Sequence, residues 1–295
     1  VVQALHIETC ASVSRLLAWV ANDVIGLRRS VVDDNLRHVF PRLGAKQRRA
    51  LARRMWEHLF LMVCEVAQAP RKIHETNFRR YIHFANKRQL VDAALASRPF
   101  VLVTGHFGNF ELGGFMTGLL GFPTFTIART LDNPYLNRFI NRFRGSKGQF
   151  ILPKQGSAHL VEAVLSSGGA LSLLGDQHAG PTGCWVDFLG RPASCHKALA
   201  LFSLTADAPL VVAYARRLGR PMHFEIGCPG IADPRDGAEI TGSVTSLTQW
   251  YNRQLERTIL ADPDQYWWVH RRWKGKPGRR RRRRKTQPTS SRAAA

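Results

Sequence analysis

Acidic residues are scarce in this sequence of 295 residues, where 21 Asp and Glu stand against 43 Lys and Arg and the formal net charge is +22. From Arg271 onward there are 12 basic residues and no acid, so the rest of the chain carries 22 − 12 = +10. Such a balance favours an anionic partner, whether nucleic acid, a phospholipid surface, a phosphorylated substrate or an acidic carrier protein. Charge alone does not choose among these four.

Cysteine is sparse and irregularly spaced. The sequence has five cysteines and no CxxC pair: Cys10, Cys64, Cys184, Cys195 and Cys228. An odd number without that spacing argues against a disulfide framework and favours free thiols in a reducing cytosol.

No apolar run is long enough to be a transmembrane helix. The best stretch, Leu16 to Leu27, is too short, contains Asn22 and Asp23, and does not fit a signal peptide. Its apolar residues follow helical spacing, and Arg28 and Arg29 come next. Two interpretations stay open, namely an amphipathic helix packed on the core and a helix lying in a membrane interface.

Several well-known catalytic motifs are missing. The sequence has no GxSxG nucleophile elbow, no GxxxxGK[ST] loop, no GxGxxG fingerprint and no HExxH zinc helix. We therefore predict neither a cofactor nor a metal, and any chemistry has to come from other residues.

The apolar pattern changes at about residue 95. Residues 1–95 are predicted to be a helical region on or near a membrane, with helices over Lys46–Ala67 and Asn86–Ala96 and a break from Asn35 to Pro41. Residues 96–277 alternate strands with helices, which predicts an α/β class with a mostly parallel central sheet flanked by helices, in one domain with the N-terminal region. The predicted strands are Phe100–Val103, Thr124–Ala128, Ala170–Leu174, Trp185–Phe188, Pro209–Tyr214 and Met222–Ile226, and the predicted helices are Pro134–Arg144, Ala158–Leu165, Lys197–Ala206 and Ser243–Leu260. Residues 278–295 are predicted to be a disordered Arg-rich tail.

The stretch Pro99 to Gly114, PFVLVTGHFGNFELGG, carries the strongest chemical signal. His106 follows a buried strand, and Asn109 is placed to cap the next helix, whose first turn holds Glu111. Open α/β sheets gather catalytic groups at the carboxyl ends of their strands. A carboxylate on one ring nitrogen raises the basicity of the other, so we predict His106 as a general base for a hydroxyl, with Glu111 orienting its ring. Backbone amides near Gly108, or an arginine, are candidates to hold an oxyanion.

A second strand end lies in Leu173 to Gly190, LLGDQHAGPTGCWVDFLG. The apolar strand ends in Asp176 and Gln177, which suits a role beside the histidine; the alternative is a solvated turn capped by Asp176. Arg129 directly follows a strand, and Arg144 ends a helix. Each is a candidate to bind a phosphate or a sugar, and each could equally be a solvated surface charge.

These motifs together resemble the late acyltransferases of lipid A biosynthesis, the lauroyl and myristoyl transferases of Gram-negative bacteria. The resemblance covers GHFGNFE, ART with LDNP, the DQ loop with WVDFLGRPA, and the ending QYWWVHRRWKGKP, and it spans about residues 35–277. The His-x4-acid motif is shared with glycerolipid acyltransferases at large, whereas the DQ loop and WVHRRWK are more specific. Two features depart from the family: Phe188-Leu189-Gly190 stands where Phe-Phe-Gly is common, and the usual N-terminal membrane segment is absent or truncated.

The resemblance implies a glycerolipid-acyltransferase-like fold, acyl transfer from acyl carrier protein, and residence at the cytoplasmic face of the cell inner membrane. It assigns His106 and Glu111 to the catalytic pair. Positions that it associates with the surroundings of the active site are Asn109, Arg129, Asn133, Arg144 and Asp176. The implied acceptor is a hydroxyl of a phosphorylated lipid A precursor, and another glycolipid acceptor stays open because relatives acylate several.

Two other function classes compete with this interpretation. The charge of +22 and the run Arg279 to Arg284 also suit a nucleic-acid-binding protein, but the excess is concentrated outside the folded body and the histidine pair has no use there. We therefore expect no nucleic-acid partner. A hydrolase with the same pair acting on water would release free fatty acid without an acceptor.

Overall fold

The computed structural model describes residues 2–96, 98–128, 130–153 and 156–277. The predictions made for Arg129 and for the tail 278–295 lie outside the described residues.

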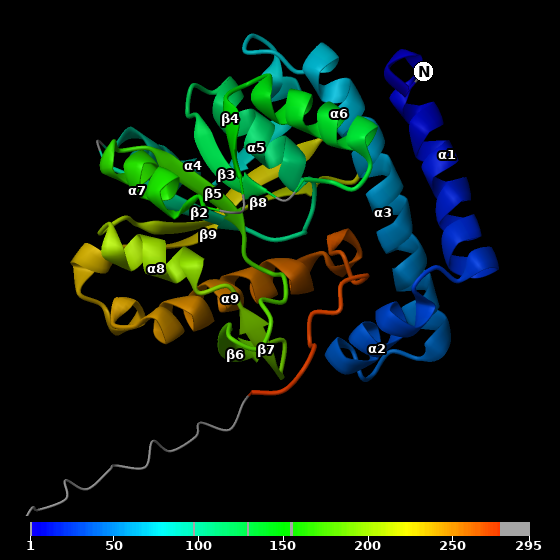
Figure 1. Cartoon of the computed structure of the whole chain (residues 1–295). Helices are drawn as coiled ribbons and strands as arrows, with labels where there is room; N and C mark the ends of the chain where they lie inside the picture. The colour runs from blue at the N-terminus through cyan, green and yellow to red at the C-terminus, as the bar shows by residue number, and fades with distance from the viewer. Residues whose placement is uncertain (1, 97, 129, 154–155, 278–295) are drawn as a thin grey trace, which may run out of the picture.

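A seven-stranded sheet forms the centre of the molecule (Figure 1). The strands stand in the order β1-β9-β8-β2-β5-β3-β4, and all neighbours are parallel except β8 and β9. Their bounds are β1 Ile82–Ala85, β2 Phe100–Thr104, β3 Thr124–Ala128, β4 Gln149–Pro153, β5 Ala170–Leu174, β8 Leu210–Arg217 and β9 Phe224–Ala232. The predicted α/β class with a mostly parallel sheet is confirmed.

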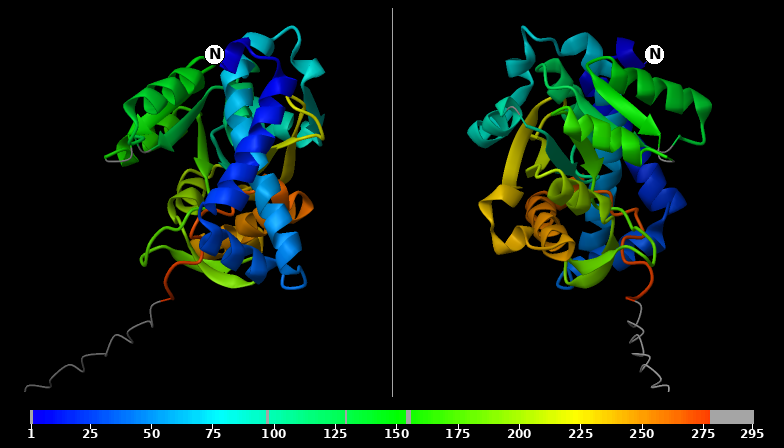
Figure 2. Two further views of the ribbon diagram at one scale, coloured as in Figure 1. Left: turned by 90° about the vertical axis from the view of Figure 1, so that its right-hand side faces the viewer. Right: turned by 60° about the vertical axis from the view of Figure 1, so that its left-hand side comes forward.

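Helices cover both faces of this sheet, which explains why its central strands are apolar on both sides (Figures 1 and 2). On one face, Val101 and Val103 of β2 share a core with residues of α7, α8 and α9; on the other, Leu102 packs toward α4. These helices are α4 Lys87–Leu95, α5 Phe110–Leu119, α6 Pro134–Gly145, α7 Ala158–Ser166, α8 Ala198–Thr205 and α9 Val244–Ala261. The predicted helices and strands after residue 99 are confirmed to within a few residues, except that the strand predicted at Met222–Ile226 continues as β9 to Ala232.

The N-terminal region consists of α1 Ile7–Trp19, a π-helical turn Val20–Ile25, α2 Arg29–Val39 and the long α3 Ala45–Lys72. α1 lies along α3 (Figure 2). Its buried side carries Ile7 and the small residues Cys10, Ser14 and Ala18, so the two helices approach closely. The large apolar side chains of α1 are exposed, namely Val13, Leu16, Leu17 and Trp19, as are Val24 and Ile25 of the π-helical turn and Leu27 after it. Packing on the core thus uses a different side of α1 from its large exposed apolar residues.

Among the described residues, no single helix is both long and apolar enough to cross a membrane. Ile7–Ile25 and Arg29–Val39 meet the length and composition requirements only as a pair, bent by 98° between them.

Four details of the prediction are wrong. The break expected at Asn35 to Pro41 begins only after Val39, because α2 continues to that residue. The N-terminal region is not wholly helical, since β1 pairs with β9 at the sheet edge. The edge strand β4 was not predicted. Trp185–Phe188 belongs not to the main sheet but to a separate antiparallel hairpin of β6 Cys184–Phe188 and β7 Arg191–Cys195.

Candidate active site

His106 lies in the tight loop that joins β2 to α5. Gly108 in this loop has φ +59°, and a Cβ there would come within 2.0 Å of the backbone oxygen of Ala215. No side chain fits at that position without moving β8. The amide of Gly108 donates to Gln265 O at 2.9 Å, and the amide of Asn109 donates to Ala215 O at 2.7 Å. The strand β8 and the C-terminal segment therefore fix His106 at the carboxyl end of β2.

Asp176, at the end of the neighbouring strand β5, holds the imidazole. His106 Nδ1 lies 2.8 Å from Asp176 Oδ1, and the His106 amide donates to Oδ2 at 2.8 Å. The carboxyl group is completely buried, which alone would raise its pKa, but its interactions with His106 outweigh burial and hold the pKa of Asp176 well below its usual range. An ionised carboxylate at Nδ1 selects the tautomer with hydrogen on Nδ1, so Nε2 presents its lone pair.

Gln177 occupies this second nitrogen. Its Nε2 donates a hydrogen bond to His106 Nε2 at 3.2 Å, and the glutamine itself is exposed. An exposed amide can rotate away at little cost, so Gln177 stands where a substrate hydroxyl would approach the base. Asp176 and Gln177 thus lie beside His106, as the sequence predicted.

Three aromatic rings surround the imidazole. The ring centroids of Phe110 and Trp267 lie 5.1 Å from that of His106, and the centroid of His270 lies 4.6 Å away with the rings edge to face. His270 in turn stacks on Trp267 at 5.7 Å. Burial and, to a lesser extent, the nearby His106 lower the pKa of His270 to about 4, so this second imidazole is neutral at neutral pH. His270 was not predicted as a site residue, although the WVHRRWK ending that contains it was noted.

Glu111 does not hold the ring. Its carboxylate receives hydrogen bonds from Nε and Nη2 of Arg144, at 2.9 Å for the first, and both side chains are largely buried. Helical geometry explains the difference, because a residue in the first turn of α5 points toward α6 rather than back into the loop. The orienting partner predicted for His106 is therefore corrected from Glu111 to Asp176.

Asn109 has a structural position. It is fully buried, its Oδ1 accepts from Leu112 N at 3.1 Å as the N-cap of α5, and its Nδ2 donates to Glu65 Oε2 at 3.2 Å. Glu65 is also bound twice by Arg217 at 2.7 Å. The predicted cap is confirmed. Both polar ends of this buried amide are engaged within the protein, and its predicted contact with substrate stays a prediction.

Asn133 also caps a helix. Its Oδ1 accepts from the amides of Tyr135 and Leu136, each at 3.0 Å, at the exposed start of α6. No described residue links it to His106. Its predicted contact with substrate stays a prediction, as does that of Arg144, whose Nη1 forms no hydrogen bond within the described part of the chain.

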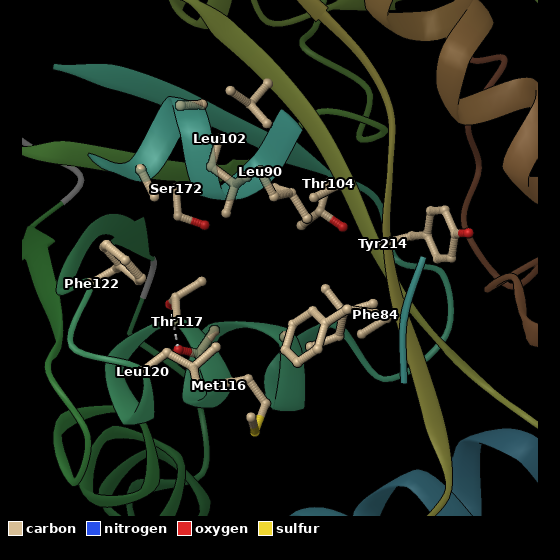
Figure 3. A pocket seen from close by; sticks show the side chains of 18 of the residues that line it. Phe84, Leu90, Leu102, Thr104, Met116, Thr117, Leu120, Phe122, Ser172 and Tyr214 are labelled. Carbon is tan, nitrogen blue, oxygen red and sulfur yellow. Dashed lines mark hydrogen bonds between the residues drawn. The ribbon is translucent and has the colours of Figure 1, made fainter. Parts of the chain in front are cut away.

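An apolar cavity of about 360 Å³ opens beside the histidine loop, between the sheet and the helices α4 and α5 (Figure 3). Thr104 and Tyr214 line one end (Figure 3), and Phe110, the ring that touches His106, also lines the cavity. Leu120, Phe122 and Ser172 lie at the opposite end, beyond Thr117 (Figure 3). The cavity therefore runs from the site along α5, over a helix about 15 Å long. Its size falls in the range of small-molecule pockets, about 300–1,000 Å³.

The site offers a base, an anion that supports it and an apolar pocket. Within the described ranges, no group of three or more His, Cys, Asp or Glu side chains could hold a metal ion. This set of groups suits proton transfer from a hydroxyl next to a long apolar substrate.

Comparisons with known proteins agree with that chemistry. Residues 1–275 match the bacterial lipid A biosynthesis acyltransferase family, and the chain belongs to this family of acyltransferases. The lauroyltransferase of lipid A biosynthesis from Escherichia coli K12 is 25% identical over 257 residues, covering 85% of this chain and 80% of its own. The palmitoleoyltransferase of the same strain is 24% identical over 267 residues, covering 88% and 82%. The predicted family is thus confirmed.

One solved structure is weakly similar. The 1-acyl-sn-glycerophosphate acyltransferase PlsC from Thermotoga maritima covers 87% of this chain and 97% of its own, with 12% identity and a TM-score of 0.42.

Proposed function

We propose that the protein transfers a fatty acyl group from acyl carrier protein to a hydroxyl of a lipid A precursor, with His106 as general base. The observation that carries this proposal is the buried His106–Asp176 pair, which leaves Nε2 as the basic nitrogen of a ring that contacts Phe110, a residue that lines the apolar cavity. Membership of the lipid A acyltransferase family supports the substrate class.

The reaction follows from the geometry of the pair. The acceptor hydroxyl displaces Gln177, His106 Nε2 takes its proton, and the oxygen attacks the thioester carbonyl carbon. Asp176 stabilises the imidazolium that forms. The carbon–sulfur bond then breaks, the thiolate leaves with the bonding pair, and the imidazolium returns the proton to it. A thiolate is a good leaving group, so no covalent enzyme intermediate is required.

The apolar cavity would bind the acyl chain. Phe110 both contacts His106 and lines the cavity, so a thioester carbonyl near the base continues directly into the cavity. A chain lying along α5 would end among Leu120, Phe122 and Ser172. This placement also explains why the cavity is lined almost entirely by apolar side chains.

Acyl carrier protein is the proposed donor because an acidic carrier complements a basic enzyme. Carrier docking between charged surfaces loses association rate as salt rises. We expect turnover with acyl carrier protein to fall with salt and to exceed turnover with acyl coenzyme A. Equal efficiency with coenzyme A would refute this choice of donor.

The exposed apolar side chains of α1 and of the π-helical turn after it support attachment to the inner membrane at its cytoplasmic face. Leu16 of α1 is 59% exposed, Val24 and Ile25 of the turn are 60% and 68% exposed, and Arg28 and Arg29 come shortly after them. Apolar residues next to basic ones are the composition of a helix that lies in an anionic membrane interface. Acceptor and enzyme would then meet at one surface.

A direct assay tests the proposal. Purified protein is incubated with acyl carrier protein carrying a labelled acyl chain and with a lipid A precursor, and the lipids are analysed by mass spectrometry. The expected result is one added acyl group, and none with His106→Ala. Release of free fatty acid in the absence of acceptor would instead indicate a hydrolase, and the absence of both products from folded wild-type protein would refute acyl transfer.

A further inference from the structure

Acyl transfer through a tetrahedral intermediate needs a hydrogen-bond donor for the carbonyl oxygen, where negative charge develops. Three amides of the histidine loop are already engaged. Gly108 N donates to Gln265 O, Asn109 N to Ala215 O, and His106 N to Asp176. Two of the Arg144 donor groups are bound to Glu111. The Gly108 amide itself is therefore not free to hold the oxyanion, whereas the other candidates, the remaining amides at the start of α5 and an arginine, stay predictions.

His270 has an unused polar atom at the right place. Its ring lies 4.6 Å from the ring of His106, and its Nε2 is buried without a hydrogen-bond partner among the described residues. Buried polar atoms are nearly always satisfied, so one left open beside a catalytic base indicates a partner that comes with the substrate.

The ring is held firmly in this position. Asn35 Nδ2 donates to the backbone oxygens of Trp268 at 2.7 Å and His270 at 2.9 Å, which joins the C-terminal segment to α2. Trp267 N donates to His106 O at 3.0 Å, and the Trp267 ring stacks on His270. A donor fixed before the substrate binds needs no reorganisation during the reaction.

A neutral ring suits the task better than a charged one. Burial keeps the pKa of His270 at about 4, so it adds no second positive charge next to the imidazolium that forms on His106. Neutral imidazole still carries one N–H and can polarise a carbonyl group.

On this basis we propose that His270 is a further catalytic residue, which donates its Nε2–H to the thioester carbonyl oxygen of the acyl donor. The inference rests on the proposed acyl transfer. As the acceptor oxygen bonds to the carbonyl carbon, the C=O pair moves to oxygen and the Nε2–H stabilises it. When the carbonyl re-forms and the thiolate leaves, His270 keeps its proton.

The test compares variants that keep the ring with variants that keep the donor. His270→Phe retains an aromatic wall against Trp267 and His106 but has no N–H. His270→Gln places an amide N–H near the position of Nε2, whereas His270→Asn places it near Nδ1. Loss of one such donor costs about 10²- to 10³-fold in kcat, and we expect that loss for His270→Phe with KM for the donor nearly unchanged. His270→Gln should recover about tenfold or more over both other variants.

Three results would overturn the inference: a His270→Phe enzyme that keeps more than a tenth of wild-type kcat, equal losses in all three variants, or a loss confined to KM. A second readout needs no turnover. In a His106→Ala background, the infrared band of a ¹³C-labelled thioester carbonyl should move to higher frequency with His270→Phe, which has no N–H, and should move less with His270→Gln, which keeps one. An unmoved band with His270→Phe contradicts the hydrogen bond. Wild-type protein that makes no acylated lipid would refute the proposed acyl transfer itself. Failure of the inference about His270 can therefore be distinguished from failure of the proposed function.

Discussion

The carboxylate that serves His106 was predicted five residues away and is found at the end of another strand. Replacing Asp176 by Asn keeps the shape of the side chain but removes the charge that stabilises the imidazolium and fixes the tautomer. We expect kcat to fall about 10²- to 10⁴-fold, as far as for His106→Ala, with the protein still folded by circular dichroism. A decrease of less than tenfold would remove Asp176 from the mechanism.

Glu111 is expected to act through Arg144. In a double-mutant cycle of Glu111→Gln and Arg144→Met, the free energies of unfolding should show a coupling of about 0.5–3 kcal/mol, because removing either partner leaves the other charge largely buried. The matched cycle of Glu111→Gln with Asp176→Asn should show none. If Glu111 and Asp176 were coupled instead, Glu111 would act on His106 after all.

The sequence predicted the His106 loop because its signals are local: an apolar strand, Gly108 and a capping Asn109 follow one another directly. It could not rank Asp176 against Glu111, since sequence spacing shows which residues are near along a helix but not which strand end lies beside the loop. His270 was missed for the same reason, because its contact with His106 depends on how the C-terminal segment returns to β2.

At the scale of elements, α5 and the sheet form the two long walls of the apolar cavity. Ser172→Leu adds volume at the end far from His106, so we expect the enzyme to prefer shorter acyl chains while keeping its rate on them. Competition between acyl carrier proteins of different chain length, followed by mass spectrometry, measures this preference. The control variant Ser166→Leu makes the same substitution at the exposed end of α7 and should leave the preference for chain length unaltered. An unchanged preference in both variants would mean that the chain lies elsewhere.

The elements that the sequence missed share a physical cause. β1 and β4 are short strands at the two edges of the sheet, with half-exposed or exposed residues, so their apolar pattern is weak. The sequence of β6 was assigned to the main sheet because alternating apolar and polar residues indicate a half-buried strand. That alternation does not show which other strand it pairs with. In contrast, β2, β5 and β8 lie at the centre, where burial on both faces gives a continuous apolar run.

At the scale of the whole molecule, attachment to a membrane should depend on α1 and the π-helical turn after it. Leu16→Gln combined with Ile25→Gln should reduce sedimentation with anionic vesicles and leave turnover on detergent-dispersed substrate near wild type, because both side chains are exposed. The control is Leu201→Gln, at an exposed leucine of α8 that is 45% exposed. Deleting residues 278–295 should likewise weaken vesicle binding without loss of detergent activity. Equal binding by all these proteins would argue against both regions as contacts.

Two buried histidines should make the fold sensitive to mild acid. Burial and the neighbouring Arg217 hold the pKa of His58 well below its usual range. Burial and the nearby His106 lower the pKa of His270 to about 4. The unfolded chain binds protons near pH 6.5 and the folded one does not, so stability is complete above that pH and declines as the pH falls toward 4. Between pH 7 and pH 5, His270→Gln should lose about 1–2 kcal/mol less unfolding free energy than wild type in urea titrations. An identical decline would mean that His270 is already protonated in the fold.

The return of the C-terminal segment to the histidine loop has a consequence for biosynthesis. Gln265 receives the Gly108 amide, Trp267 is bonded to His106, and Asn35 holds the backbone of Trp268 and His270. These contacts join α2, the histidine loop and residues 265–270, so the loop cannot be completed before residue 270 has left the ribosome. A nascent chain would stay without acyltransferase activity until that segment has returned to the loop.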